Sequence, residues 1–316
     1  MVPGLIQATK QANPILPDFA SDPSIAAFGD TYYIYPTTDK QKYKSFYVYK
    51  SRNLVDWTKK EEPILTLNEK EGAGNCPWAK GKANAPTIIE RNGKYYLYHV
   101  GRNSLEGSVT IGVAVADSPE GPFTGEPKAM ITGKEKMSPL EVIDPMAFRD
   151  PKTGKYWLYW GNGRLLHAEL KDDMVSIDKD TLSESRGLTK YYEAPFVMFH
   201  KGLYHMTWST GTSGSEWCRV GYATGKSATG PWENHGVILE KRPELGILGT
   251  GHHSILNVPD TDDWYIVYNR FAITNETSMF RRHEVAIDRM TFDEDTGRIK
   301  PVTPTLEGVP AQEIKV

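Results

Sequence analysis

The chain has 316 residues, of which 39% are hydrophobic and 24% are charged, and its formal net charge at pH 7 is −3. This composition is typical of a folded domain with a sizeable core and excludes a largely disordered chain. The small net charge gives no electrostatic reason to expect nucleic acid or an anionic membrane as a partner, and no apolar run approaches the length that spans a bilayer. We expect one domain over residues 1–316, and composition predicts no oligomeric state.

The N-terminal residues, Met1 to Ile6, do not combine a basic region with an apolar core, so they do not resemble an export signal. We expect a periplasmic or secreted protein whose signal has been removed, with a cytoplasmic protein as the alternative. Cys76 and Cys218 lie far apart and show neither metal-ligand nor redox spacing, so we interpret them as unpaired thiols.

A short phrase recurs along the chain. It consists of a dipeptide that usually ends in proline, a short apolar run, a turn containing glycine, and an aromatic pair such as Tyr32-Tyr33. Short strands repeating at this length are typical of the blades of a β-propeller. The copies open at Asp22-Pro23, Ala85-Pro86, Asp144-Pro145, Ala194-Pro195 and Gly251-His252.

The strand signals within a copy are clear. In the first copy, the β-prone runs 25–28 and 32–35 flank the turn pair Gly29-Asp30, which is typical of a hairpin, and a third strand is expected over 46–49. We predict an all-β, five-bladed β-propeller. Aromatic residues after the third strands are expected to pack between blades: Trp57, Phe123 and Trp232. The blades are expected near 22–65, 85–131, 144–178, 193–240 and 251–300.

Three blade openings carry a carboxylate: Asp22, Asp144 and, one residue before its dipeptide, Glu193. Because each blade begins near the axis of the ring, we expect these acids to meet at one mouth. Two facing carboxyl groups can cleave a glycosidic bond, since one protonates the leaving oxygen and the other activates water. A third carboxylate would raise the pKa of the acid so that it keeps its proton near neutrality.

The residues around these acids carry a family resemblance. The strings 20–25, 143–150 with 154–161, and 192–195 resemble the three catalytic signatures of glycoside hydrolase family 43, and the resemblance spans all five repeats. It implies a single catalytic domain with a five-bladed propeller fold that hydrolyses with inversion.

The resemblance also implies a role for each acid. Asp22 would be the general base, Glu193 the general acid, and Asp144 the group that tunes and orients the acid. The departure from the family lies in the second blade, where Asn84 replaces a tryptophan of the sugar pocket and Trp78, a few residues upstream, is a candidate replacement.

Two further strings match the family. Gly249-Thr250-Gly251-His252 resembles the fifth-blade signature, which implies that His252 faces the central channel and supports a bound cation through water, a structural Ca²⁺. Tyr268-Asn269-Arg270 resembles a signature whose arginine reaches the catalytic carboxylates, which implies that Arg270 keeps the base ionised. No cofactor is required.

Each assignment has a structural alternative. An Asp before Pro is frequently a turn cap, Arg270 could pair within the core, and His252 could be a hydrogen-bonded channel residue rather than a metal ligand. Asp30 and Asp150 fall in hairpin turns, and we interpret them as structural.

We therefore expect an inverting exo-glycosidase that removes non-reducing-end sugars from plant-type polysaccharides or oligosaccharides. By resemblance the sugars rank as α-L-arabinofuranose, then β-D-xylose, then β-D-galactofuranose. Three other classes stay open: a retaining invertase-type enzyme, since Arg149-Asp150-Pro151 matches one of its strings, a propeller phosphorylase, and a sugar-binding propeller without activity.

Overall fold

The computed structural model describes residues 12–38, 44–67, 75–273 and 282–315, and this part of the chain is built almost wholly from strands. Its one helical segment is a single 3-10 turn, η1 (Pro243–Leu245). Among these residues no helix is both long and apolar enough to cross a bilayer. The fold class expected from the repeats is therefore all-β, as predicted.

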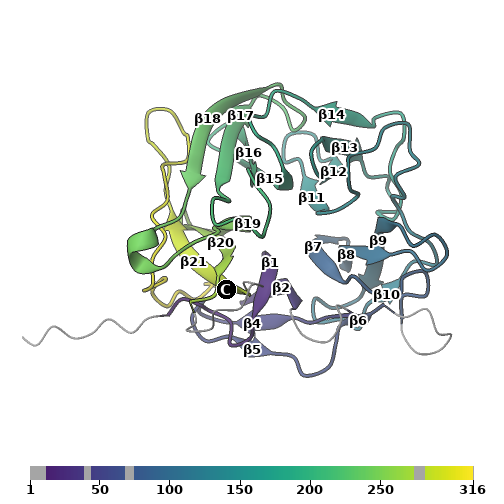
Figure 1. Cartoon of the computed structure of the whole chain (residues 1–316), viewed down its shortest axis with the longest axis horizontal. Coiled ribbons are helices and arrows are strands. Elements are labelled where there is room, and N and C mark those ends of the chain that lie inside the picture. The colour runs from purple at the N-terminus through teal and green to yellow at the C-terminus, as the bar shows by residue number, and fades with distance from the viewer. Residues whose placement is uncertain (1–11, 39–43, 68–74, 274–281, 316) are drawn as a thin grey trace, which may run out of the picture.

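Five sheets stand around a common axis, and their order in space follows their order in the chain (Figure 1). The first strands of the sheets contact one another in a closed circuit, β1 with β7, β7 with β11, β11 with β15, β15 with β19, and β19 with β1. This arrangement confirms the five-bladed β-propeller.

The first two blades are four-stranded antiparallel sheets. In the first blade the strands are β1 (Ala20–Phe28), β2 (Thr31–Thr38), β4 (Tyr49–Ser51) and β5 (Thr58–Lys59), with the small pair β3 (Ser45–Phe46) and β6 (Leu65–Thr66) beside them. In the second they are β7 (Asn84–Arg91), β8 (Lys94–Arg102), β9 (Val109–Ala116) and β10 (Thr124–Gly125).

The remaining blades contain four, four and three strands. The third is β11 (Met146–Arg149), β12 (Tyr156–Trp160), β13 (Leu165–Glu169) and β14 (Ser183–Ser185). The fourth is β15 (Glu193–His200), β16 (Leu203–Ser209), β17 (Val220–Gly225) and β18 (Trp232–Leu239). The fifth is β19 (Gly251–Asn257), β20 (Trp264–Phe271) and β21 (His283–Met290).

Two local expectations differ from the structure. The run 46–49 does not form one strand, because Phe46 pairs with Leu65 in the small sheet while Tyr49 pairs with Ile34 and Lys59 in the main one. The outer strand of the third blade, β14, lies beyond residue 178, where that blade was expected to end.

The core lies in the seams between blades. Five buried hydrophobic clusters are found, and each draws its residues from two neighbouring blades. Phe123 belongs to the cluster between the first and second blades, Trp232 to that between the third and fourth, and Trp57 packs on that between the fifth and first. The aromatic residues expected between blades therefore lie there.

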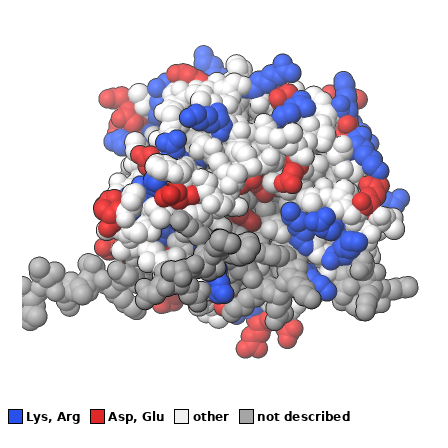
Figure 2. All heavy atoms as spheres, viewed as in Figure 1, with Lys and Arg blue, Asp and Glu red and all other residues white. Residues whose placement is uncertain are grey.

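Lysine, arginine, aspartate and glutamate side chains are interspersed over the face seen along the short axis (Figure 2). On the described part of this face no large field of one sign is visible, which agrees with the small net charge of −3.

Residues near both ends of the chain close the ring at the seam between the fifth and first blades. Asn13 is 3% exposed. Its side-chain amide pairs with the backbone of Ile287 as a neighbouring strand would, because Nδ2 donates to Ile287 O at 3.0 Å and Oδ1 accepts from Ile287 N at 2.9 Å. Ile15 N donates to Val285 O at 2.9 Å, and Gln312 N donates to Asn53 O in the first blade at 3.0 Å. The outer edge of β21 is thus covered rather than left open.

We expect Asn13→Ala to lower the free energy of unfolding by about 2 to 3 kcal/mol, because it leaves the buried Ile287 N–H and C=O without partners. Urea denaturation followed by tryptophan fluorescence measures this loss. Asn257→Ala is the matched control, since its amide donates to Thr261 O and Asp263 O within one hairpin and crosses no seam. Equal losses in the two variants would contradict a special role for Asn13.

Candidate active site

The five innermost strands open with the same unusual backbone. Five equivalent residues have positive φ, a conformation that is uncommon for residues other than glycine: Asp22 (50°), Ala85 (43°), Asp144 (56°), Ala194 (55°) and His252 (23°). In four of the five blades the strand register also shifts at this point. Such bulges redirect side chains, and here they turn the residues at the openings toward the axis.

Asp22 is held by contacts from its own blade and from the fifth blade. Its Oδ1 lies 3.0 Å from His252 Nδ1 in the fifth blade, and its Oδ2 accepts a hydrogen bond of 2.6 Å from the Thr37 hydroxyl. The same hydroxyl accepts the N–H of Ala85 in the second blade at 2.7 Å. The Asp22 N–H points to Asn269 Oδ1 at 3.3 Å. Both carboxylate oxygens are therefore fixed before any ligand arrives.

Asp144 and Glu193 lie next to this pair. Asp144 Oδ2 is 3.9 Å from His252 Nδ1 and accepts the N–H of Ala194 at 3.0 Å, which places it against the residue that follows Glu193. Glu193 Oε2 accepts a hydrogen bond of 3.2 Å from the side-chain amide of Asn162. The structure thus brings the three predicted acids together around one imidazole.

The two acids beside Asp22 are held towards their protonated forms. Burial, reinforced by the charge of Asp144, raises the pKa of Glu193 to about 8. Burial also raises the pKa of Asp144 to about 6, against the opposing charge of His252. Like charges in a shared, poorly solvated site cannot all ionise, so one proton stays on this pair near neutrality.

Asp22 behaves in the opposite way. Burial alone would raise its pKa, but the charge of His252 and hydrogen bonds from His252 and Thr37 outweigh burial and lower the pKa to about 2. The pKa of His252 is raised to about 9 because Asp22 and Asp144 outweigh the effect of its burial. An ionised carboxylate and a protonated carboxyl thus occupy one site, which is the equipment for a base and an acid in glycosidic cleavage.

Arg270 pairs with other groups than Asp22, Asp144 and Glu193. It is 1% exposed, its Nε lies 2.8 Å from Glu284 Oε1, and its Nη1 donates to Thr305 O at 3.2 Å. Because neighbouring residues of a strand face opposite ways, Asn269 reaches Asp22 while Arg270 turns away from it. The resemblance assigned the charge partner of the base to Arg270, and the structure gives that place to His252.

The two residues of the expected sugar wall lie in different surroundings. Asn84 is half-buried at the opening of β7, in the position that Glu193 occupies in the fourth blade. Trp78 is 7% exposed, and its ring lies over Gly101 and Gly112 and stacks with His99. These contacts are packing contacts within the protein, and they do not support a part for Trp78 in sugar binding. That part stays a prediction.

Three site residues were not anticipated from the sequence. Thr37 and Asn162 bind Asp22 and Glu193 directly, and Ser209 Oγ accepts the N–H of His252 at 2.9 Å. Thr37 and Ser209 are the last or nearly the last residues of second strands, which run antiparallel to the innermost strands and end beside their openings. A polar residue at the end of a second strand is therefore the sequence signal that could have predicted Thr37 and Ser209 as site residues.

The described residues offer little for direct metal binding. No group of three or more His, Cys, Asp or Glu side chains among them is arranged to hold a metal ion. Asp22 and Asp144 outweigh the burial of His252 and raise its pKa to about 9, and a protonated imidazole has no lone pair for a cation. The expected Ca²⁺ stays a prediction.

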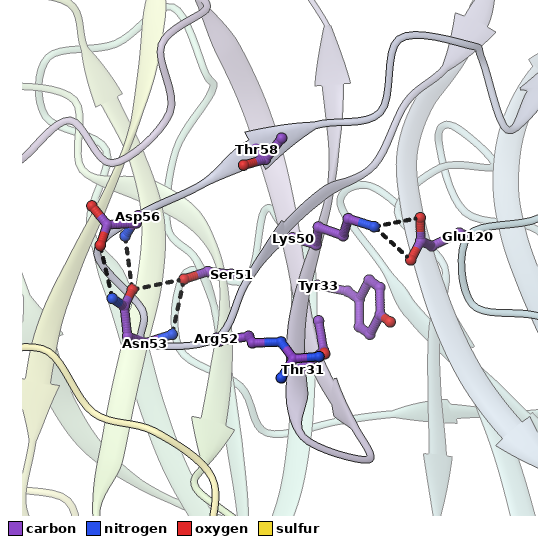
Figure 3. Close-up of a pocket in the computed structure, with 9 residues that line it drawn as sticks. All are labelled: Thr31, Tyr33, Lys50, Ser51, Arg52, Asn53, Asp56, Thr58 and Glu120. Carbon is purple, nitrogen blue, oxygen red and sulfur yellow. Dashed lines mark hydrogen bonds and ion pairs between the residues drawn. The ribbon is translucent and has the colours of Figure 1, made fainter.

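A separate cavity of about 530 Å³ lies on the first blade near Glu120 of the second (Figure 3). Its charged groups are already paired, because Lys50 Nζ contacts both Glu120 oxygens at 3.0 Å and Asn53 Nδ2 donates to Asp56 Oδ2 at 2.8 Å. Thr31, which lines it, opens β2 at the end of the strand away from Asp22. The Lys50–Glu120 ion pair in this cavity joins the first blade to the second. The residues that line the cavity do not include Asp22, Asp144 or Glu193.

A five-bladed propeller with an acid and a base at the axis defines a glycoside hydrolase of the propeller type. The family model of glycosyl hydrolases family 43 matches residues 11–297, and the chain belongs to that family. The family hydrolyses with inversion and needs no cofactor. The retaining, phosphorylase and inactive alternatives are therefore not supported.

Relatives named for three sugars resemble the chain. It is 35% identical to β-D-galactofuranosidase xynD of Aspergillus niger, over 95% of this chain and 87% of that protein. It is 27% identical to a β-xylosidase of Xylanibacter ruminicola, over 90% and 97% of the two chains. A solved α-L-arabinofuranosidase of Clostridium thermocellum is 26% identical, with a TM-score of 0.73 over 93% and 96% of the two chains.

We expect Glu193→Gln and Asp22→Asn each to lower kcat by about 10³-fold or more, because each removes the proton donor or the proton acceptor of the reaction. Initial rates on an activated glycoside measure this, with circular dichroism confirming that the variants fold. Glu90→Gln, in the hairpin between β7 and β8, is the control and should retain activity. A rate near that of wild type in either site variant would refute its role.

We expect His252→Gln to move the acidic limb of the pH profile to higher pH by at least about one unit. Asp22 stays buried but loses its cationic neighbour, so its pKa rises from about 2 and protonation inactivates the base at a higher pH than in wild type. Measuring kcat/KM from pH 3 to pH 9 follows the limb. His235→Gln, on β18, should leave it in place, and an unmoved limb in His252→Gln would show that another group keeps Asp22 ionised.

Proposed function

We propose that the chain is an exo-acting furanosidase that removes single sugars from the non-reducing ends of plant-type oligosaccharides or polysaccharides. The hydrolytic part of the proposal rests on the pairing of a buried carboxyl held protonated, Glu193, with a carboxylate held ionised, Asp22, and the choice of a furanose rests on the 35% identity to a relative named a β-D-galactofuranosidase. The family level, a hydrolase of xylosides, arabinosides or galactofuranosides, is established, and the proposal concerns the sugar.

Arabinofuranose and galactofuranose rank together as the sugar. β-D-Galactofuranose has the ring configuration of α-L-arabinofuranose and differs by one further hydroxymethyl group on the exocyclic chain. A pocket that binds the ring of one sugar therefore suits the ring of the other. The relative named a galactofuranosidase is 35% identical, whereas the relatives named for xylose or arabinose in these comparisons are 24 to 28% identical. That difference raises galactofuranose above its place in the sequence-based ranking.

Asn84 gives a physical reason for a longer sugar. An amide at the opening of β7 is smaller than the indole that the family often has there, and it offers both a donor and an acceptor. It therefore suits a sugar with an additional hydroxyl on its exocyclic chain better than an apolar ring would. β-D-Xylose, a six-membered ring without an exocyclic carbon, is the alternative.

We expect 4-nitrophenyl β-D-galactofuranoside and α-L-arabinofuranoside to be hydrolysed with kcat/KM at least about tenfold above that for the β-D-xyloside. The reason is that a site shaped for a substituted five-membered ring loses contacts to a six-membered one. A parallel kinetic comparison of the three glycosides, with arabinan and arabinoxylan beside them, measures the order. Preference for the xyloside would overturn the furanosidase proposal while leaving the family assignment intact.

A further inference from the structure

The large hydrophobic side chains that are most exposed gather at one end of the propeller. Among the described residues they are Leu105 (95%), Leu140 (78%), Trp217 (66%) and Ile273 (49%). Three of them follow β8, β16 and β20, which run antiparallel to the innermost strands and so end where those strands open. Leu140 N donates to the backbone oxygen of Asn162, whose side chain binds Glu193. All four therefore lie at the catalytic end.

Trp217 differs from the other three because its ring is held in place. Lys241 Nζ lies 3.0 Å from the centroid of the Trp217 ring, and the same ammonium is 3.2 Å from Glu216 Oε2. The Lys241 side chain is only 14% exposed, so a partly desolvated cation covers one side of the indole. With 66% of Trp217 exposed, the other side of the ring faces solvent.

The loop that carries Trp217 is also fixed to the catalytic centre. Cys218, the next residue, packs so closely on Gly251 that a Cβ there would lie 2.5 Å from its sulfur. Gly251 precedes His252, whose N–H donates to Ser209 Oγ at the start of the loop. Trp217 is therefore held on a short, braced segment next to the site rather than on a free surface.

We propose that Trp217, supported by Lys241, is the platform on which a sugar ring on the leaving-group side of the substrate stacks. The inference rests on the proposed function and extends it to the part of the glycan that is not removed. The face of a sugar ring carries C–H groups that pack on an indole, and the face of Trp217 that Lys241 does not cover is open to them. A ring fixed in advance also loses little conformational freedom on binding.

The test compares two kinds of substrate. A nitrophenyl glycoside has no sugar on the leaving side, whereas a branched arabinan oligosaccharide or a galactofuranose-terminated oligosaccharide does. We expect Trp217→Ala to lower the ratio of kcat/KM for the oligosaccharide to kcat/KM for the nitrophenyl glycoside about tenfold, the loss expected for one aromatic contact. Leu105→Ala, which changes a still more exposed apolar residue at the same end, is the control and should keep the wild-type ratio.

Two further variants report on the ring itself. Trp217→Phe should restore part of the ratio, because a smaller ring keeps part of the stacking surface. Lys241→Gln should lower the ratio less than Trp217→Ala, since it frees the indole without removing it. Calorimetric titration of the same oligosaccharide into Glu193→Gln, with and without Trp217→Ala, should show weaker binding in the double variant.

An unchanged ratio in Trp217→Ala, or an equal fall in Leu105→Ala, would overturn the platform. Unchanged oligosaccharide affinity in the double variant would do the same and would favour a protein partner for this face. Failure of wild type to hydrolyse any furanoside would instead refute the proposed function, and the titration would still decide whether Trp217 binds glycan. Thermal unfolding of each variant separates these effects from loss of fold.

Discussion

The contact on which the site depends is the ion pair between His252 and Asp22, 3.0 Å apart. It joins the fifth blade to the first across the seam that closes the ring, so folding and chemistry share one interaction. A buried carboxylate would otherwise take up a proton, and a buried imidazole would lose one. Together they hold opposite charges, and the positive member also faces Asp144 at 3.9 Å. The geometry of the closed ring therefore sets which acid is ionised.

Closure itself is built from polar contacts and apolar packing that do not repeat between blades. The hydrophobic cluster of the closing seam contains Ile15, Val285 and Val309, which come from both ends of the described chain. Asn13 adds its amide to the backbone of β21. The other four seams join blades that are consecutive in the chain. Contacts at this seam bring the first and last blades together, so they must offset the larger entropic cost of closing the whole ring.

Much of the fold could be predicted from the sequence because the repeat consists of local signals: proline at four of the five openings, a turn with glycine, and an aromatic pair. The three acids could be predicted for the same reason, since they occupy equivalent openings. The partner of the base could not. Arg270 and Asn269 are neighbours on one strand, and which of them faces the axis depends on the register that the bulge at Gly251 sets. Thr37, far from any acid in the repeat pattern, is likewise placed by pairing rather than by a motif.

The departure of Glu193 from the repeat has a physical reason in the backbone. The left-handed position of the fourth blade is Ala194, and its N–H donates to Asp144 at 3.0 Å. A carboxylate at residue 194 would bring a second negative group to the point where Asp144 already receives that N–H. With the acid one residue earlier, no second charge lies at that point, and burial together with the charge of Asp144 raises the pKa of Glu193. A symmetric frame with alanine at two openings, aspartate at two and histidine at one thus becomes an asymmetric site, in which position along the bulge separates the acid from the base.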